Sequence, residues 1–264
     1  MSVHRRAGVA ASLLAMMLVG GCASDPASSR EELKTSSDQT DIQNRARIRL
    51  QLAIGYYEQR QLEVALDEVK RALQADPSFA EAYNVRGLIY MDMTENRLAE
   101  DNFLQSIKLS PANPDFNNNY GWFLCQTGRE RQSLPYFDAA LKNRAYQSPA
   151  KALNNAGVCS LKSKDTAAAE RYFTQAFQYE PGNPSTNANL AKLYYDRKDY
   201  ERSRFYIGRV MKGDIMTADV LWLAIKTERK LGDRAAETSL ATQLRRRYPN
   251  SVEYAAYQRG AFDE

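Results

Sequence analysis

Residues 80–111 read AEAYNVRGLIYMDMTENRLAEDNFLQSIKLSP, and this stretch contains the pattern that determines the fold. Large and small side chains occupy fixed positions along it, and a proline closes it: Tyr83, Gly87, Tyr90, Ala99, Phe103 and Pro111. The small residues mark places where two helix backbones can approach closely. We therefore expect this stretch to form two antiparallel helices that interlock.

The same template recurs along the chain with a nearly constant period. Its six copies are separated by 34 residues, with one step of 36, and begin at Ala46, Ala80, Pro114, Ala150, Pro184 and Ala218. This is the tetratricopeptide pattern, in which each repeat is one helix pair. The sequence therefore predicts an all-α fold: a tetratricopeptide-repeat solenoid of six helix-pair repeats that forms a right-handed superhelix. Such a stack behaves as one extended unit, and we expect it to hold another protein.

The beginning of the chain has the features of a processing signal. Arg5 and Arg6 precede an apolar run from Val9 to Val19, which is too short to span a bilayer. The small residues directly before Cys22 resemble a bacterial lipobox. We expect residues 1–21 to be a lipoprotein signal peptide and Cys22 to be lipidated. An ordinary signal peptide, which does not need the thiol, is the alternative.

The residues after Cys22 indicate where the anchor would hold the protein. Bacterial lipoproteins generally carry three acyl chains, enough for a stable tether. Ala23 follows Cys22, whereas Asp at that place retains many lipoproteins on the inner membrane of Gram-negative bacteria. We therefore expect the protein to be lipid-anchored on the periplasmic face of the outer membrane. Residues 22–40 are too polar to bury a core and are predicted to be a lipidated flexible linker. Residues 41–264 would then be the six-repeat domain with a C-terminal capping helix.

The composition disfavours catalysis. The single histidine, His4, lies in the predicted signal, so the mature chain would have no imidazole for a nucleophilic triad or a metal. The sequence contains no glycine-rich phosphate loop and no HExxH stretch. We predict no enzyme activity, no cofactor, no metal and no nucleic-acid partner. The basic triplet at residues 245–247 is best explained as a solvated helix end.

Two cysteines fall in the first helices of neighbouring repeats, Cys125 in the third and Cys159 in the fourth. Such helices run side by side, so the two Cα atoms can lie within the ~4.4–6.8 Å that a disulfide requires. An oxidising periplasm favours the bond. Two buried free thiols are the alternative, since cysteine also fills cores as a small apolar side chain.

The first helix of each repeat is expected to line the concave surface of the solenoid. In the first three repeats its inward positions hold a run of apolar side chains: Leu50, Ile54, Tyr57, Leu88, Met91 and Trp122. We call this set the concave trough and predict that it binds a partner, because exposed apolar patches of this size usually mark an interaction site. Alternatively, the 23–40 linker or a neighbouring helix covers the trough and makes it core.

Asparagines recur at the fifth position of three successive repeats, as Asn84, Asn118 and Asn154. A primary amide can donate to and accept from an extended peptide backbone. The three could therefore form a ladder that holds a bound strand, and Asn84 and Asn118 would extend the trough. They could equally be asparagines that face solvent. Further along, Pro135 would be harmless if Ser133 capped the second helix of the third repeat.

The stretch NNNYGWFLCQ at residues 117–126, with Cys159 in the next repeat and the lipobox at Cys22, resembles the type IV pilus biogenesis lipoproteins called PilW or PilF. The resemblance covers essentially the whole chain. It implies a pilotin, which takes the secretin subunit to the outer membrane and promotes its multimerisation. Cys22 would then be the lipid anchor of a monomer, and the concave trough the secretin-binding surface.

Two other classes of protein share this build. One is a general periplasmic scaffold lipoprotein that organises envelope enzymes. The other is a structural part of a machine that inserts outer-membrane proteins. The repeats themselves exclude neither.

Overall fold

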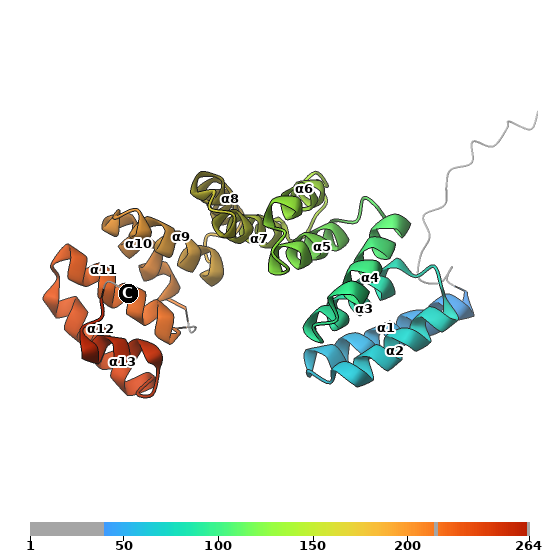
Figure 1. The fold of residues 1–264 in the computed structure, drawn as a ribbon, viewed down its shortest axis with the longest axis horizontal. Helices are drawn as coiled ribbons and strands as arrows, with labels where there is room; N and C mark the ends of the chain where they lie inside the picture. The colour runs from blue at the N-terminus through green and yellow to red at the C-terminus, as the bar shows by residue number, and fades with distance from the viewer. Residues whose placement is uncertain (1–39, 214–215, 263–264) are drawn as a thin grey trace, which may run out of the picture. The chain divides into compact units, whose positions relative to one another are not determined.

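The computed structural model describes residues 40–213 and 216–262. The predicted signal peptide, Cys22 and, apart from Thr40, the predicted linker lie outside these residues. From Asp41 onward the chain forms one compact unit, and the secondary structure of its described residues is entirely helical (Figure 1). None of these helices is both long and apolar enough to cross a membrane.

Twelve of the helices form six antiparallel pairs that follow one another in chain order (Figure 1). The pairs are α1 (Asp41–Glu58) with α2 (Leu62–Ala75), α3 (Ala80–Asp92) with α4 (Asn96–Leu109), α5 (Pro114–Gln126) with α6 (Glu130–Leu141), α7 (Pro149–Lys162) with α8 (Thr166–Tyr179), α9 (Pro184–Asp196) with α10 (Tyr200–Val210), and α11 (Ala218–Leu231) with α12 (Arg234–Arg247). A thirteenth helix, α13 (Val252–Arg259), follows the last pair and packs on α11 and α12. The predicted all-α repeat fold is confirmed.

Glycines in the first helices let a phenylalanine from the second helix of the same repeat approach the backbone. A Cβ added at Gly157 would lie 2.5 Å from the ring of Phe173. The same contact recurs in three successive repeats, between Gly87 and Phe103, Gly121 and Phe137, and Gly157 and Phe173. All three rings are fully buried. This close approach is the physical reason for the small and aromatic positions of the template.

The turn between the two helices of every repeat contains one residue with positive φ. These residues follow the period of the template: Arg60, Thr94, Gly128, Lys164, Lys198 and Gly232, with φ between 61° and 82°. A left-handed residue ends a helix by redirecting the chain. Because the same turn is used six times, each second helix begins at an equivalent place.

The expected start of α6 is wrong. The helix begins at Glu130 rather than after Ser133, so Pro135 is its sixth residue. Ser133 is buried inside the helix, and its Oγ donates to the carbonyl of Glu130 at 2.6 Å. The turn at Gly128 sets the helix start, as in the other repeats, and this outweighs the capping preference of serine. Pro135 leaves the carbonyl of Arg131 without its helical donor, which is tolerable because Arg131 is exposed.

Candidate partner-binding surfaces

The structure divides the predicted concave trough into exposed and buried parts. Ile54 is 38% exposed. Tyr57, Leu88, Met91 and Trp122 are partly buried, and each packs against a core cluster with the rest of its side chain accessible. Burial and a hydrogen bond to Asp92 raise the pKa of Tyr57 to about 12. These five side chains come from α1, α3 and α5, which pack side by side, and they remain candidates for contact with a partner.

Three other residues assigned to the trough are buried, so their assignment as open binding residues is wrong. Leu50 is 5% exposed and belongs to the core cluster that joins α1, α2 and α3. Asn84 is 7% exposed and Asn118 fully buried. The fifth position of a first helix therefore faces the next first helix rather than the open surface.

The asparagines do not form a ladder for a bound strand, and they do not simply face solvent. The amide at the fifth position of one repeat accepts a hydrogen bond from an asparagine at the sixth position of the next. Asn119 donates to Asn84 at 3.2 Å, Asn155 to Asn118 at 3.0 Å, and Asn189 to Asn154 at 3.1 Å. We call these three contacts the asparagine pairs. They join α3, α5, α7 and α9 in series, and Asn84 and Asn118 are buried in making them, where a bound peptide would not reach.

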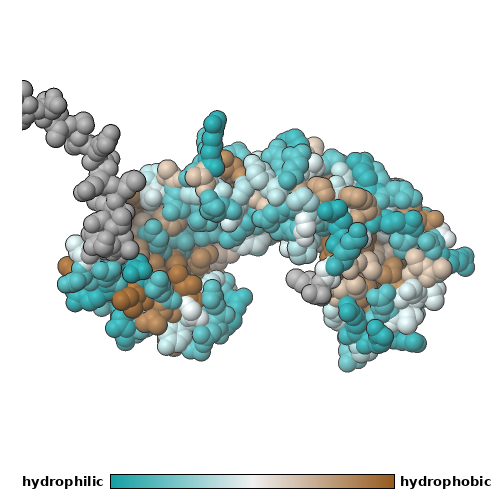
Figure 2. Space-filling view, turned by 180° about the vertical axis from the view of Figure 1, so that it is seen from behind, coloured by the Kyte–Doolittle hydropathy of each residue, from teal (hydrophilic) through white to brown (hydrophobic). Residues whose placement is uncertain are grey.

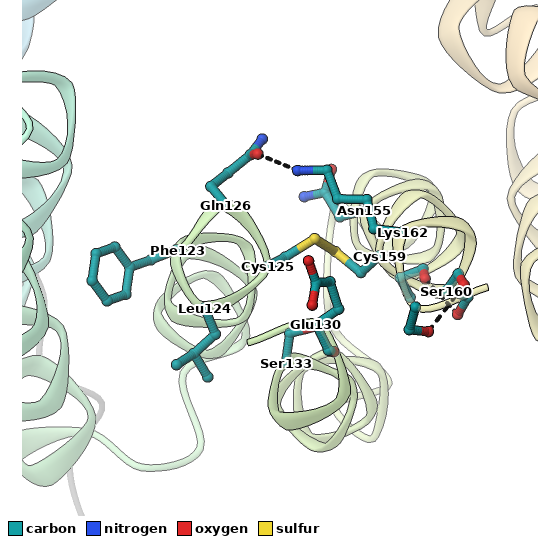
Figure 3. The surroundings of a disulfide bond; sticks show 12 residues. Phe123, Leu124, Cys125, Gln126, Glu130, Ser133, Asn155, Cys159, Ser160 and Lys162 are labelled. Carbon is teal, nitrogen blue, oxygen red and sulfur yellow. Dashed lines mark hydrogen bonds between the residues drawn. A yellow bond between two sulfur atoms is a disulfide. The ribbon is translucent and has the colours of Figure 1, made fainter. Parts of the chain in front are cut away.

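Cys125 of α5 and Cys159 of α7 are joined by a disulfide in the structure, with their Cα atoms 5.7 Å apart. Figure 3 shows the bond between the two helices. Both cysteines are buried beside Phe137, and Trp122 packs against the same cluster. Close to the bond, Lys162 Nζ donates to Gln126 Oε1 at 2.6 Å (Figure 3). The disulfide therefore fixes the third repeat to the fourth at the helices that carry the asparagine pairs.

An apolar surface that the sequence analysis missed lies on the outer side of α1. Ile48 is 52% exposed and Leu52 44% exposed. They line a groove of about 390 Å³ together with Gly55, Tyr56 and two polar residues, Gln51 and Gln59. A Cβ added at Gly55 would meet no atom within 4 Å. We call Ile48, Leu52, Gly55 and Tyr56 the α1 outer face. In the view of Figure 2, hydrophobic side chains gather over the N-terminal helix pairs, while the middle of the unit is mostly hydrophilic.

A terminal repeat normally presents a polar outer side, because no further repeat covers it. The α1 outer face departs from this rule with two half-exposed aliphatic side chains on one stripe of the helix. The spacing of Ile48, Leu52 and Tyr56, four residues apart, was the available sequence signal. The exposure of these side chains could not be predicted from the repeat template, because in the inner repeats the same positions contact the preceding helix pair. This surface is consequently the stronger candidate for partner binding.

Two carboxylates with a lowered pKa, Glu100 and Glu170, belong to ion pairs between repeats. Glu100 of α4 accepts from Arg129 at 2.7 Å and from Tyr120 Oη at 2.9 Å. The guanidinium of Arg129 lowers the pKa of Glu100. Glu170 of α8 makes the same kind of contact with Arg197 and Tyr194, and Arg197 lowers its pKa. Both carboxylates thus join a second helix to the first helix of the next repeat.

Across the described part of the chain, no three His, Cys, Asp or Glu side chains lie close enough together to hold a metal ion. The exposed apolar surfaces found above are of a kind that usually marks protein contact.

Sequence profiles described as tetratricopeptide repeat match residues 50–92, 86–148 and 124–176, and a second profile of the same description matches residues 160–214. Over 252 residues the chain is 28% identical to the type IV pilus assembly protein PilF of Pseudomonas aeruginosa, an alignment that covers 95% of this chain and 98% of that protein.

Two solved structures of similar proteins have the same fold over most of their length. The crystal structure of PilW, a widely conserved type IV pilus biogenesis factor, superimposes with a TM-score of 0.75 at 30% identity and covers 81% of this chain and 98% of PilW. The structure of Pseudomonas aeruginosa PilF gives a TM-score of 0.77 at 27% identity, covering 84% of this chain and 100% of PilF. The chain therefore belongs to the PilW/PilF family of tetratricopeptide-repeat proteins of type IV pilus biogenesis.

Proposed function

We propose that this protein is the pilotin of a type IV pilus: an outer-membrane lipoprotein that binds the secretin subunit and promotes its localisation and multimerisation. Family membership supports a role in pilus biogenesis. Scaffold proteins of this kind are typically non-catalytic. The observation that carries the binding role is the α1 outer face, where Ile48 and Leu52 are exposed on a terminal repeat.

An apolar helix or strand of the secretin would dock along this face, as amphipathic segments do in preformed grooves. Burying a large aliphatic side chain stabilises a complex by about 1.5–3 kcal/mol. Because Ile48 and Leu52 are already about half buried, covering the rest of both would account for about ten- to a hundredfold in affinity. The exposed side of the concave trough, around Ile54, is a second possible contact on the same helix.

The predicted lipid anchor at Cys22 would concentrate the bound secretin at the membrane and raise the effective concentration of subunits there. In the proposal the anchor is needed for location and the repeats for binding. A Cys22→Ala variant should bind the secretin in solution with unchanged affinity but leave the outer-membrane fraction. Retention of that variant in the outer membrane would contradict the anchor.

The binding proposal is tested with the purified mature chain and purified secretin subunit, by isothermal titration calorimetry. We expect the double variant Ile48→Asp, Leu52→Asp to bind about a hundredfold more weakly, because docking would bury two carboxylates without partners. The matched control is Leu104→Asp in α4, since Leu104 is 43% exposed, nearly the same as Leu52.

Wild-type affinity in the double variant, with a loss in Ile54→Asp instead, would place the contact in the concave trough. Undiminished binding in all these variants would exclude both surfaces as the secretin-binding site. A chain that binds envelope enzymes and not the secretin would be the scaffold lipoprotein described above.

A further inference from the structure

The series of asparagine pairs stops between the fifth and sixth repeats. By the rule of the preceding repeats, the fifth position of α9 would accept from the sixth position of α11. Those positions hold Ala188 and Leu223, neither of which has a polar side chain. Ala188 is also far smaller than the asparagines or the Leu50 found at this position in repeats one to four.

A cavity of about 260 Å³ lies at this break, and Ala188, Asn189 and Leu223 all line it. Ile207 and Val210 of α10 add apolar surface, and Tyr195 and Trp222 add aromatic surface. Trp222 is held in place by Phe262, whose ring centroid lies 5.3 Å away. The break in the series of asparagine pairs thus coincides with a mostly apolar pocket, which residues of α9, α10, α11 and α13 line.

The size of this pocket limits what can enter it. Sites for cofactors and drug-sized ligands usually measure about 300–1,000 Å³, and this pocket is below that range. One large apolar side chain fits the space, and the aromatic walls favour such an anchor. The pocket is therefore suited to a single side chain of a protein segment.

The charges around the pocket differ in whether they are already paired. Lys192 Nζ lies 2.9 Å from Asp196. Lys226 Nζ lies 5.3 Å from the ring centroid of Tyr195 and 5.5 Å from that of Trp222, which is a cation–π arrangement.

Two carboxylates complete the lining, Asp219 of α11 and Glu253 of α13. Neither carboxylate forms an ion pair within residues 40–213 and 216–262. Asp219 is exposed and Glu253 partly exposed, so both are accessible to a partner. The unpaired charge beside the pocket is thus negative, and it complements a cation on the incoming segment.

We propose that the pocket between α9 and α11 is a second binding site, which receives a large apolar side chain followed by lysine or arginine in a segment of another protein. This site is separate from the α1 outer face and does not depend on what binds there. A chain with both sites would hold two protein segments at once.

The two tryptophans of the chain give an internal comparison for a test by NMR. The mature chain, labelled with ¹⁵N, is titrated with the acetylated and amidated peptide Ser-Gly-Leu-Arg-Gly-Ser. We expect the indole resonance of Trp222 to shift in a saturable way while that of Trp122 stays in place. The peptide with Ala in place of Leu should cause no shift, and the peptide with Glu in place of Arg should bind about fivefold or more weakly.

Two variants keep the test independent of any one substitution. Ala188→Leu fills the pocket with a residue that the first repeat already has at this position, and it should abolish the shift of Trp222. The double variant Asp219→Asn with Glu253→Gln should weaken binding of the arginine peptide about fivefold. It should not weaken binding of the glutamate peptide. The matched control is Glu63→Gln with Glu201→Gln, since both residues are also first-turn acids.

An unchanged Trp222 resonance up to millimolar peptide would overturn the proposal. Equal binding of the arginine and glutamate peptides would overturn the assigned charge, and wild-type binding by Ala188→Leu would overturn the site. A shift of Trp222 that depends on protein concentration without peptide would show that a second copy of the chain fills the pocket, which also overturns it.

Discussion

Three asparagine pairs join the first helices of neighbouring repeats, and the accepting amide of Asn118 is fully buried among them. A buried amide that loses its partner costs the free energy of its desolvation, about 1–3 kcal/mol. The pairs therefore help to fix the spacing of the first helices. They also remove polar atoms from the surface and leave the regions at the two ends of the series apolar.

We predict that Asn118→Ala lowers the free energy of unfolding by about 1–3 kcal/mol, because Asn155 loses its acceptor. A double-mutant cycle with Asn155→Ala, measured by urea denaturation, should give a coupling energy of at least about 0.5 kcal/mol. Asn96→Ala is the control, since Asn96 is exposed. Additive effects of the two substitutions would contradict the pairing.

The contact of Glu100 with Arg129 makes stability depend on pH in a definite direction. Arg129 lowers the pKa of Glu100 below 4.5, its ordinary value. The contact therefore stabilises the fold above that pH and is lost as the pH falls through the lower, folded-state pKa. Because the pair is partly exposed, the effect should be under about 1 kcal/mol. Between pH 7 and pH 3 the free energy of unfolding, measured by urea denaturation, should fall less for Glu100→Gln than for wild type. The control Glu63→Gln should behave like wild type. Parallel losses in all three proteins would contradict this.

At the scale of helices, the template predicted where most of the first helices begin. Those of repeats two, three, five and six begin at the predicted residues Ala80, Pro114, Pro184 and Ala218. By contrast, α7 begins one residue early, and α1 begins at Asp41, well before the predicted Ala46. The repeat period predicts these helix starts because the same turn recurs in every repeat and the same glycine–phenylalanine contact recurs in three of them. The predicted start of α6 is wrong because the turn at Gly128 sets it, and not the capping preference of Ser133.

The contact between first and second helices predicts opposite effects of the same substitution at two glycines. Gly157→Ala should destabilise the protein by about 1–3 kcal/mol, because the new Cβ would lie 2.5 Å from the ring of Phe173. Gly208→Ala in α10 should stabilise it by about 0.5–1 kcal/mol, because no atom lies within 4 Å of the new Cβ. Thermal unfolding followed by circular dichroism measures both. An equal change in the two variants would exclude the close approach as the cause.

The disulfide between α5 and α7 should stabilise the unit by about 3–4 kcal/mol through restriction of the unfolded chain. We expect protein isolated from cells without reductant to show Cys125 and Cys159 bonded in non-reducing mass spectrometry. We also expect reduction to lower the midpoint of urea unfolding. Free thiols in the isolated protein, or unfolding that is insensitive to reductant, would contradict the bond.

At the scale of the whole molecule, both proposed binding sites lie where the regular repeat ends or breaks. The α1 outer face is exposed because no described helix pair precedes it. The pocket between α9 and α11 lies where Ala188 stands in place of the asparagine of repeats two to four. The sequence could predict the solenoid because the fold depends on what the repeats share. It could not identify these surfaces by position in the template, because they depend on how single repeats differ.

The proposed function requires that this solenoid use its first repeat to assemble a secretin in the outer membrane. To test this, the gene is deleted and the deletion strain is complemented with one of three genes: wild type, the double variant Ile48→Asp with Leu52→Asp, or Leu104→Asp. The inner and outer membranes of each strain are then separated. Immunoblotting then measures the heat-resistant secretin multimer and the monomer in each fraction. We expect multimer in the outer membrane with wild type and Leu104→Asp. With the double variant and the deletion we expect monomer that remains in the inner membrane. Normal multimer in the deletion strain would contradict the pilotin role, and normal multimer with the double variant alone would contradict the α1 outer face.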